Sequence, residues 1–123
     1  KMSAEFGTDP KDVIACVGPS ICGDCYEVGE EVAVVFAEEF GPRWEREILR
    51  PGVRPGKYQL DLWKANEAVL LEAGIAPDHL HVTDICTCCN PDYLYSHRKM
   101  GEKRGNLCAF LALKSPFFGQ KYL

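Results

Sequence analysis

Most of the seven cysteines lie in two short clusters whose spacing is typical of a metal site. Cys22 and Cys25 form a C-x-x-C pair in a predicted loop, and far downstream Cys86, Cys88 and Cys89 form C-x-C-C. Thiolates that converge from two chain segments can hold tetrahedral zinc or an iron–sulfur cluster. The pattern therefore makes Cys22, Cys25, Cys86 and Cys89 the candidate metal ligands.

Apolar packing is the alternative interpretation of these cysteines. A zinc ribbon usually repeats C-x-x-C in both clusters, whereas the second cluster here is irregular, and free cysteine is among the most buried residue types. A redox pair fits less well, because residues 26–28 separate Cys25 from the first turn of the next predicted helix. Cys16 and Cys108 each fall within an apolar run, and we expect both in the core.

Histidine and arginine residues provide the other candidate sites. His79 and His81 would share one face of a strand and could share a metal, although exposed histidines are the alternative. His97 and Arg98 follow apolar residues, which is consistent with a pocket rim where Arg98 binds an anionic group such as phosphate; an exposed strand end is the alternative. No carboxylate pair, Walker loop or nucleophile motif is present, so we predict no catalytic residue within this sequence.

Composition narrows the class of protein. The 123 residues are 46% hydrophobic and 26% charged, which is typical of a folded domain. The net charge of −4 comes from scattered residues of both signs, so neither a basic stripe nor a nucleic-acid partner is predicted. No apolar run is long enough to span a bilayer, so no membrane partner is predicted. The odd cysteine count and the absence of a signal-peptide core favour a reducing cytoplasm.

Apolar periodicity, caps and turn residues predict the elements that must position these side chains. In chain order they are a helical turn over 1–6, a strand over 13–17, a helix over 29–40, an exposed connector over 43–57 that allows one helical turn at 44–49, a helix over 62–73, a strand over 79–83, a strand over 93–95, a charged turn over 99–105 and a strand over 106–113. This order predicts an α+β fold with a mixed sheet and packed helices.

The ends of the sequence carry two further expectations. Residues 1–6 have no N-cap and are followed by Gly7, so we expect a helix whose beginning is absent, with a frayed terminus as the alternative. The domain is expected to occupy residues 1–114, and residues 115–123 are expected to form a tail.

Several segments together resemble the laccase-domain family, also called multicopper polyphenol oxidoreductase or purine nucleoside phosphorylase of that fold. The order and spacing agree over residues 12–113. The segments are Val17-Gly-Pro-Ser-Ile21 with Cys25-Tyr-Glu-Val28, then Leu60-Asp-Leu-Trp-Lys-Ala-Asn66, and finally Asp84-Ile-Cys-Thr87 with Tyr95-Ser-His-Arg-Lys99. The family often has Tyr at position 97 and Arg at position 99, and Cys22, Cys88 and Cys89 are additional to its common pattern.

The resemblance implies that this chain is the C-terminal portion of a larger laccase-domain fold. It implies phosphorolysis of adenosine, inosine and methylthioadenosine, with adenosine deamination as a second activity; polyphenol oxidation was the earlier attribution. The family's zinc or copper site uses two histidines and one cysteine in Val-His-Gly, Ala-Asp-Cys-Leu-Pro and His-Ala-Gly-Trp-Arg-Gly segments. None of these segments occurs in this sequence, so they are expected upstream of Lys1.

The partners expected from this resemblance are a purine nucleoside, phosphate and the missing N-terminal part of the same domain. The chain alone is then expected to be inactive. The alternative function is a small zinc or iron–sulfur module, ligated by cysteines and without catalysis.

Overall fold

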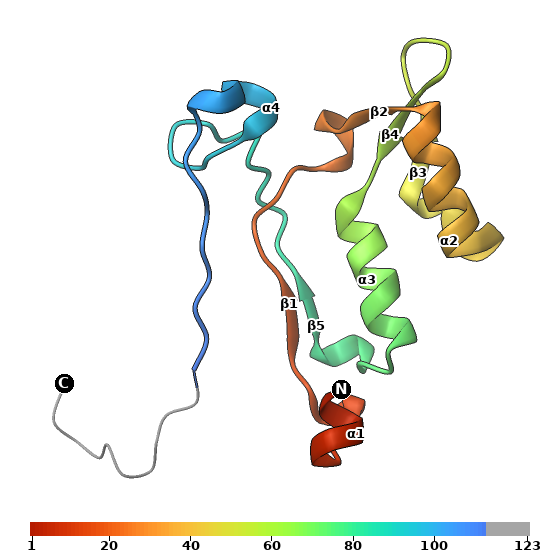
Figure 1. Cartoon of the computed structure of the whole chain (residues 1–123), viewed down its shortest axis with the longest axis vertical. Helices are drawn as coiled ribbons and strands as arrows, with labels where there is room; N and C mark the ends of the chain where they lie inside the picture. Colours follow the sequence, from red (N-terminus) through yellow and green to blue (C-terminus); the bar gives the residue numbers. More distant parts are fainter. Residues whose placement is uncertain (113–123) are drawn as a thin grey trace, which may run out of the picture.

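The computed structural model describes residues 1–112, which form an α+β fold built around two separate small sheets (Figure 1). The fold class agrees with the sequence-based expectation. The predicted tail over 115–123 lies outside the described residues. Among the residues described, no helix has the length and apolar character needed to cross a membrane.

One sheet is antiparallel and lies against the longest helix. Its strands are β2 (Glu27–Gly29), β3 (Leu49–Pro51) and β4 (Lys57–Leu60), in the order β2-β4-β3. Helix α2 (Glu30–Ile48) contacts all three strands. The main buried cluster consists of Val28, Trp44, Ile48, Leu60, Ala65 and Ala68. These residues place the hydrophobic core between α2, α3 (Leu62–Glu72) and this sheet.

Helix α2 bends at Gly41-Pro42, where the sequence predicted its end. Gly41 has φ 67° and ψ 179°, a left-handed backbone angle that favours glycine, and the chain then becomes helical again. Trp44 and Ile48 are buried in this second part, so the exposed connector predicted from residue 43 was wrong, whereas the helical turn allowed at 44–49 is present. The indole Nε1 of Trp44 donates a hydrogen bond of 2.7 Å to Glu72 Oε1 on α3. The Gly41-Pro42 signal therefore interrupts the helix, and burial of Trp44 and Ile48 stabilises the helical segment that follows.

The remainder of the predicted connector contains strands β3 and β4. Gly52 N donates to Lys57 O at 2.7 Å, and Gly56 turns the chain at φ 71°. Each strand has only three or four residues, and β4 pairs with β2 as well as with β3. The register partners are distant in sequence, so local periodicity did not reveal them.

Helix α3 begins and ends at the residues predicted from its caps. The side chain of Asp61 accepts hydrogen bonds from Trp63 N and Lys64 N, both at 3.0 Å, as an N-cap does. Gly74 follows the helix at φ 94°. The helix contacts α2 and both strands of the second sheet, so it joins the two halves of the fold (Figure 1).

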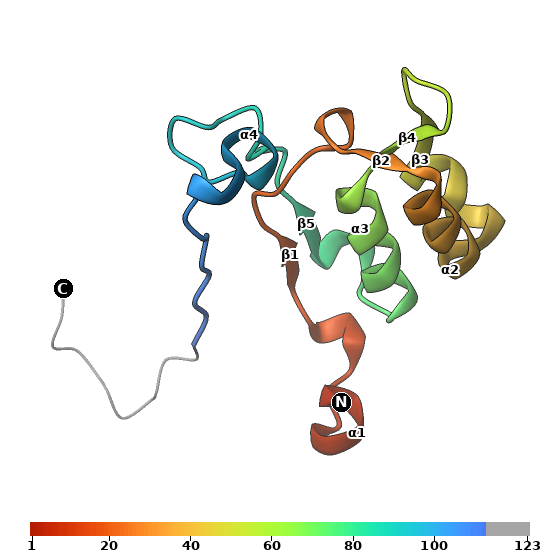
Figure 2. The ribbon, with the colours of Figure 1, turned by 45° about the horizontal axis from the view of Figure 1, so that its top comes forward.

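The second sheet is a parallel pair of short strands, β1 (Ala15–Val17) and β5 (Leu80–Val82) (Figure 2). Both lie within strands that the sequence predicted. Helix α3 packs on one side of the pair, whereas Ile14, Cys16 and His81 are exposed. The expectation that Cys16 lies in the core was therefore wrong, because no described element covers this face of β1.

The first and last described segments are short and peripheral. Helix α1 (Met2–Phe6) has no side-chain N-cap and ends at Gly7 with φ 65°, as predicted. The charged turn contains α4 (His97–Met100) and a 3₁₀ turn over Gly101–Lys103.

Two predicted strands near the end of the described chain were wrong. Residues 93–95 lie in a turn closed by the hydrogen bond from Leu94 N to Asn90 O, at 3.1 Å. Residues 106–112 form no helix or strand, and Cys108 in this stretch is exposed rather than in the core. No partner strand for residues 106–112 exists within the described chain, and residue 113 lies outside it.

Candidate functional site

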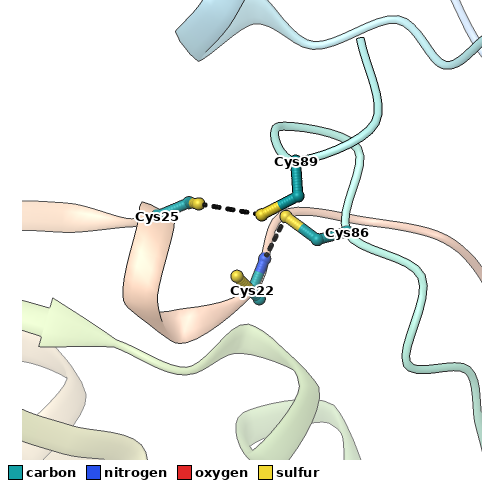
Figure 3. A group of neighbouring side chains, drawn as sticks. All are labelled: Cys22, Cys25, Cys86 and Cys89. Carbon is teal, nitrogen blue, oxygen red and sulfur yellow. Dashed lines mark hydrogen bonds between the residues drawn. The ribbon is translucent and has the colours of Figure 1, made fainter. Parts of the chain in front are cut away.

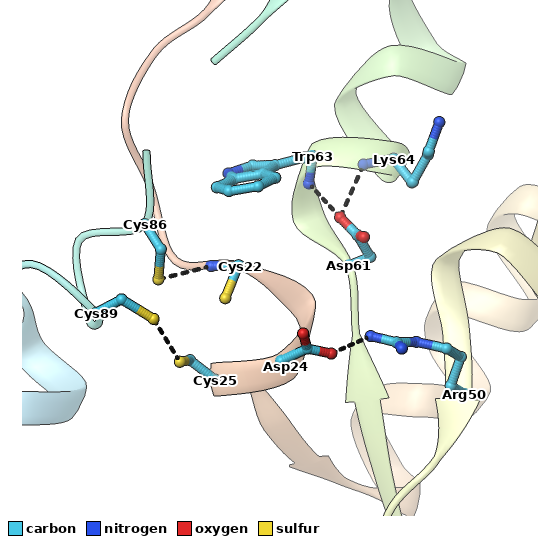
Figure 4. A network of polar contacts seen from close by, with 9 residues as sticks. All are labelled: Cys22, Asp24, Cys25, Arg50, Asp61, Trp63, Lys64, Cys86 and Cys89. Atoms are coloured by element: carbon cyan, nitrogen blue, oxygen red, sulfur yellow. Dashed lines mark hydrogen bonds and ion pairs between the residues drawn. The ribbon is translucent and has the colours of Figure 1, made fainter. Parts of the chain in front are cut away.

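The first cysteine cluster lies on a tight turn fixed against the start of α3. Cys22 precedes a 3₁₀ turn over Gly23–Cys25, and Cys25 N donates to Cys22 O at 3.1 Å. Gly23 is buried, and a Cβ at this position would lie 3.1 Å from the Cβ of Asp61. Asp24 accepts a hydrogen bond of 2.7 Å from Arg50 Nη2. Close packing against Asp61 and the ion pair of Asp24 with Arg50 therefore hold this turn (Figure 4).

The second cysteine cluster is held by the segment that precedes the first. Ser20 and Cys86 form an isolated parallel bridge, and Thr87 N donates to Ser20 O at 3.1 Å. The hydroxyl of Ser20 accepts a hydrogen bond of 2.6 Å from the indole Nε1 of Trp63. Asn90 closes the turn by donating from N, at 3.1 Å, and from Nδ2, at 2.7 Å, to Cys86 O.

The two turns bring four sulfur atoms together (Figure 3). The Sγ atoms of Cys22, Cys25, Cys86 and Cys89 all lie within 4.8 Å of one another. These are the four candidate metal ligands chosen from the spacing, and Cys88 is not part of the group. The second cluster therefore contributes Cys86-x-x-Cys89, so both turns present a C-x-x-C pair.

The cysteines of this group affect one another's ionisation. Burial acts to raise the pKa of Cys86, but hydrogen bonds with Cys22 and Cys89 outweigh it and lower that pKa to about 6. Burial and the hydrogen bonds with Cys89 and Cys22 raise the pKa of Cys25. The hydrogen bond with Cys25 acts to lower the pKa of Cys89, but the neighbouring Cys86 raises it above its usual value. The group thus favours a thiolate at Cys86 beside the protonated thiols of Cys25 and Cys89.

A hollow of about 620 Å³ lies beside the two cysteine turns. Its wall combines residues next to the cysteines with residues of α4 and the segment that follows. The lining residues are Pro19, Ser20, Ile21, Tyr26, Thr87, Tyr95, Ser96, His97, Arg98, Arg104, Gly105, Asn106 and Leu107. The hollow therefore has hydroxyl groups, two tyrosine rings and three basic side chains, a set that suits a polar ligand with an aromatic or anionic part.

Arg98 lies at this hollow, as the sequence-based hypothesis required. Its guanidinium carbon is 5.1 Å from the centre of the Tyr26 ring, and its Nη1 donates to Glu27 O at 3.1 Å. Stacking and one hydrogen bond therefore orient the guanidinium while its other N–H donors stay available. Binding of phosphate by Arg98 remains a prediction.

The histidines do not form a site of their own in the described part of the chain. His79 lies in the 3₁₀ turn Pro77–His79, before β5 begins at Leu80, so the predicted shared strand face with His81 is absent. Neither residue belongs to a group of three or more candidate ligands among the described residues. His97 lies at the hollow and on the first turn of α4 instead of at a strand end.

Sequence reasoning missed several residues of the hollow. Arg104 was assigned only to a charged turn, and Thr87 was noted only as part of a family segment. Both line the same hollow as Arg98. The positive charge of Arg104 was the one feature of the sequence that could have indicated a place in this hollow. The contact of Ser20 with Trp63 joins residues 43 positions apart, and no feature of the sequence indicated it.

Comparison with known proteins provides independent information on this chain. The family described as multi-copper polyphenol oxidoreductase laccase matches residues 1–114. A purine nucleoside phosphorylase of Bacteroides thetaiotaomicron is 38% identical over 107 residues, covering 87% of this chain and 39% of that protein. Adenosine deaminase RL5, from an unknown prokaryotic organism, is 35% identical over 91 residues, covering 74% of this chain and 34% of that protein.

The chain is also similar to a solved structure over most of its length. The crystal structure of YlmD from Geobacillus stearothermophilus has a TM-score of 0.69 and 32% identity, covering 80% of this chain and 36% of that chain. The chain thus spans between 34% and 39% of the length of these relatives.

Proposed function

Because the chain belongs to the multi-copper polyphenol oxidoreductase laccase family, we propose that it forms the C-terminal part of a purine nucleoside phosphorylase. Its role in the proposal is to supply one wall of the nucleoside and phosphate site. The observation that carries the proposal is the position of Arg98, which is stacked on Tyr26 at the hollow that His97 and Arg104 also line. The name of the Bacteroides thetaiotaomicron relative supports the choice of reaction.

Phosphorolysis requires a group that holds an anion. A phosphate oxygen attacks C1′ of the nucleoside while the bond from C1′ to the purine nitrogen breaks, and the purine leaves and takes up a proton. A fixed guanidinium can bind two phosphate oxygens at once, which orients the nucleophile and lowers the cost of bringing its charge into the site. Arg98 is the residue that we assign to this task, and the aromatic rings of Tyr26 and Tyr95 are suited to stack against a purine.

The metal that the family resemblance implies does not fit the residues of this chain. The resemblance calls for two histidines and one cysteine, whereas the cysteine quartet is the one group of three or more candidate ligands within residues 1–112, and no histidine joins it. We therefore derive no step of the reaction through a metal held by this chain.

The exposed face of the parallel sheet supports a place within a larger domain. Parallel sheets normally have both faces covered, and a two-stranded one is not stable alone. Here Ile14, which adjoins β1, is 73% exposed; outside the sheet, Phe110 and Leu111 are also almost fully exposed. We propose that residues 1–114 complete their core against the N-terminal part of the same laccase-type domain, outside this sequence. The proposed compartment is the cytoplasm, where the seven free thiols stay reduced.

Adenosine deamination is the second candidate activity, favoured by the name of the RL5 relative. In this reaction water replaces the exocyclic amino group of the purine, which yields inosine and ammonia. The glycosidic bond remains intact, so the two reactions have different products and only the first consumes phosphate.

The test uses the natural-length protein, meaning the full gene product that contains this chain. Inosine and adenosine are each supplied with and without phosphate, and the products are separated by chromatography. The proposal predicts free purine and ribose 1-phosphate that form only when phosphate is present. Inosine and ammonia from adenosine without phosphate would identify the deaminase activity alone. Absence of turnover in every mixture would overturn both assignments.

A further inference from the structure

The four converging cysteines point to a metal site that is separate from the substrate chemistry. Their Sγ atoms all lie within 4.8 Å of one another. A zinc ion binds thiolate sulfur at about 2.3 Å, so four sulfurs at the corners of a tetrahedron lie about 3.8 Å apart. Small rotations of the cysteine side chains would therefore bring all four sulfurs onto one ion (Figure 3).

We propose that Cys22, Cys25, Cys86 and Cys89 bind one structural zinc ion in a tetrahedral site. The inference is independent of the proposed phosphorolysis, because it rests on the ligand set alone. Each pair has the C-x-x-C spacing of a zinc knuckle, and the pairs come from two segments whose members Cys25 and Cys89 are 64 positions apart. Packing of thiols in an apolar core, the alternative from the sequence, does not fit Cys89, which is exposed.

The backbone around the sulfurs is already arranged for a bound ion. Cys22 N donates to Cys86 Sγ at 3.3 Å, which is the kind of hydrogen bond that stabilises a metal-bound thiolate. This hydrogen bond also joins the two cysteine turns directly, without the help of a bound ion. The site therefore needs little reorganisation to bind zinc.

Contacts outside the cluster hold both turns in place (Figure 4). The pair of Arg50 with Asp24 and the close approach of Gly23 to Asp61 fix the first turn. The hydrogen bond of Thr87 N to Ser20 O fixes the second, and Ser20 is in turn bound by Trp63. These contacts anchor the two cysteine turns to β3, to the start of α3 and to the segment that follows β1.

Zinc fits the ligand set better than magnesium, calcium or a cubane iron–sulfur cluster. Four thiolates in a tetrahedron are typical of zinc, whereas oxygen ligands, which magnesium and calcium prefer, are absent from the group. In a cubane iron–sulfur cluster each thiolate binds a different iron, which spreads the four sulfurs over a larger volume. The compact quartet therefore favours a single ion.

The proposed zinc has a structural role with a direct effect on the hollow. Four protein ligands fill a tetrahedral site and leave no open position for water or substrate. The residues that flank the ligands, among them Ile21, Tyr26 and Thr87, line the hollow. An ion that joins the two turns would thus fix the wall on which Arg98 is stacked.

The test measures zinc in the natural-length protein, purified without chelators, by mass spectrometry of the elements. The variant Cys22→Ser/Cys89→Ser is compared with wild type and with a matched control, Cys16→Ser/Cys108→Ser, which alters two thiols outside the quartet. We expect the first variant to lose one zinc per chain relative to wild type and the control to lose none. Equal zinc in all three proteins, or iron with sulfide in the wild type, would overturn the proposal.

A second measurement on the wild type keeps the test decisive if the double variant does not fold. Cysteines are alkylated in the native protein before and after treatment with a strong chelator, and the modified positions are mapped. We expect the four cysteines of the quartet to be protected from alkylation until the chelator removes zinc, and to react afterwards. Equal alkylation of the quartet before and after chelation, or protection that only a reductant removes, as for disulfides, would contradict a zinc site.

Discussion

Cys25 and Cys89 are 64 positions apart in the chain, yet their Sγ atoms lie 3.5 Å from each other. The segment between them contains α2, the antiparallel sheet, α3 and β5. A link between these two residues therefore closes a loop around most of the described fold. Such a link lowers the entropy of the unfolded chain, and the loss grows slowly with loop length.

Metal removal should for this reason lower thermal stability. Binding of an ion to the folded state alone stabilises it, so stripping zinc from the natural-length protein should lower the melting temperature by about 4 °C or more. Differential scanning calorimetry before and after chelation measures the change. The variant Cys22→Ser/Cys89→Ser should melt lower than wild type from the start and respond less to chelation. An equal response in both proteins would show that the stabilising ion is bound elsewhere.

A small residue is required at Gly23. A Cβ there would lie 3.1 Å from Asp61 Cβ and 3.3 Å from Arg50 Nη2, so Gly23→Ala should push the first cysteine turn away from α3. We expect about tenfold weaker zinc binding in competition with a chromophoric chelator, equivalent to about 1.4 kcal/mol. Gly18→Ala is the matched control, since a Cβ at that position meets nothing within 4 Å. Unchanged zinc affinity in Gly23→Ala would mean that the turn is not fixed by this contact.

The bend in α2 is stabilised by the indole of Trp44. Trp44→Phe removes the hydrogen bond to Glu72, and because the Glu72 carboxylate is exposed and stays hydrated, the lost bond should lower the free energy of unfolding by about 0.5–1.5 kcal/mol. Glu72→Gln keeps an acceptor oxygen for the indole and should cost less. Urea denaturation of the natural-length protein gives both values. A larger loss in Glu72→Gln than in Trp44→Phe would contradict this account of the bend.

The exposed face of β1 should be an interior face in the natural-length protein. Ile14 is 73% exposed and Val53 is 91% exposed in this chain, but only Ile14 adjoins the open parallel sheet. Ile14→Asp should therefore lower the melting temperature of the natural-length protein by about 4 °C or more, because it would bury a charge. Val53→Asp, in the turn between β3 and β4, should leave the melting temperature nearly unchanged. Equal effects of the two substitutions would argue against a covered sheet.

Local signals predicted the elements that depend on them. Helix α3 was predictable because Asp61 caps its start and Gly74 follows its end, and both act within a few residues. The antiparallel sheet was missed because its strands are short and β4 pairs with the distant β2. Residues 93–95 and 106–112 are rich in bulky apolar side chains, as strands often are, but a strand needs a partner, and the described chain provides none for either segment.

The candidate site was predictable to a similar degree. Spacing alone identified the four cysteines that converge, since each C-x-x-C turn is a local feature. Arg98 was identified from the residues around it, whereas its stacking on Tyr26 and the presence of Arg104 in the same hollow depend on contacts between distant segments. The exposure of Cys16 could not be inferred, because an apolar run predicts burial without indicating what covers it.

Arg98 is the residue that we propose binds the phosphate used in phosphorolysis, and steady-state kinetics of the natural-length protein measure that role. Arg98→Ala should raise KM for phosphate about tenfold or more and leave KM for inosine much less affected, because a charge-assisted hydrogen bond contributes about 1.5–3 kcal/mol. Arg98→Lys should recover part of the loss, and Arg46→Ala, on the exposed side of α2, should match wild type. An unchanged KM for phosphate in a folded, active Arg98→Ala protein would contradict the account.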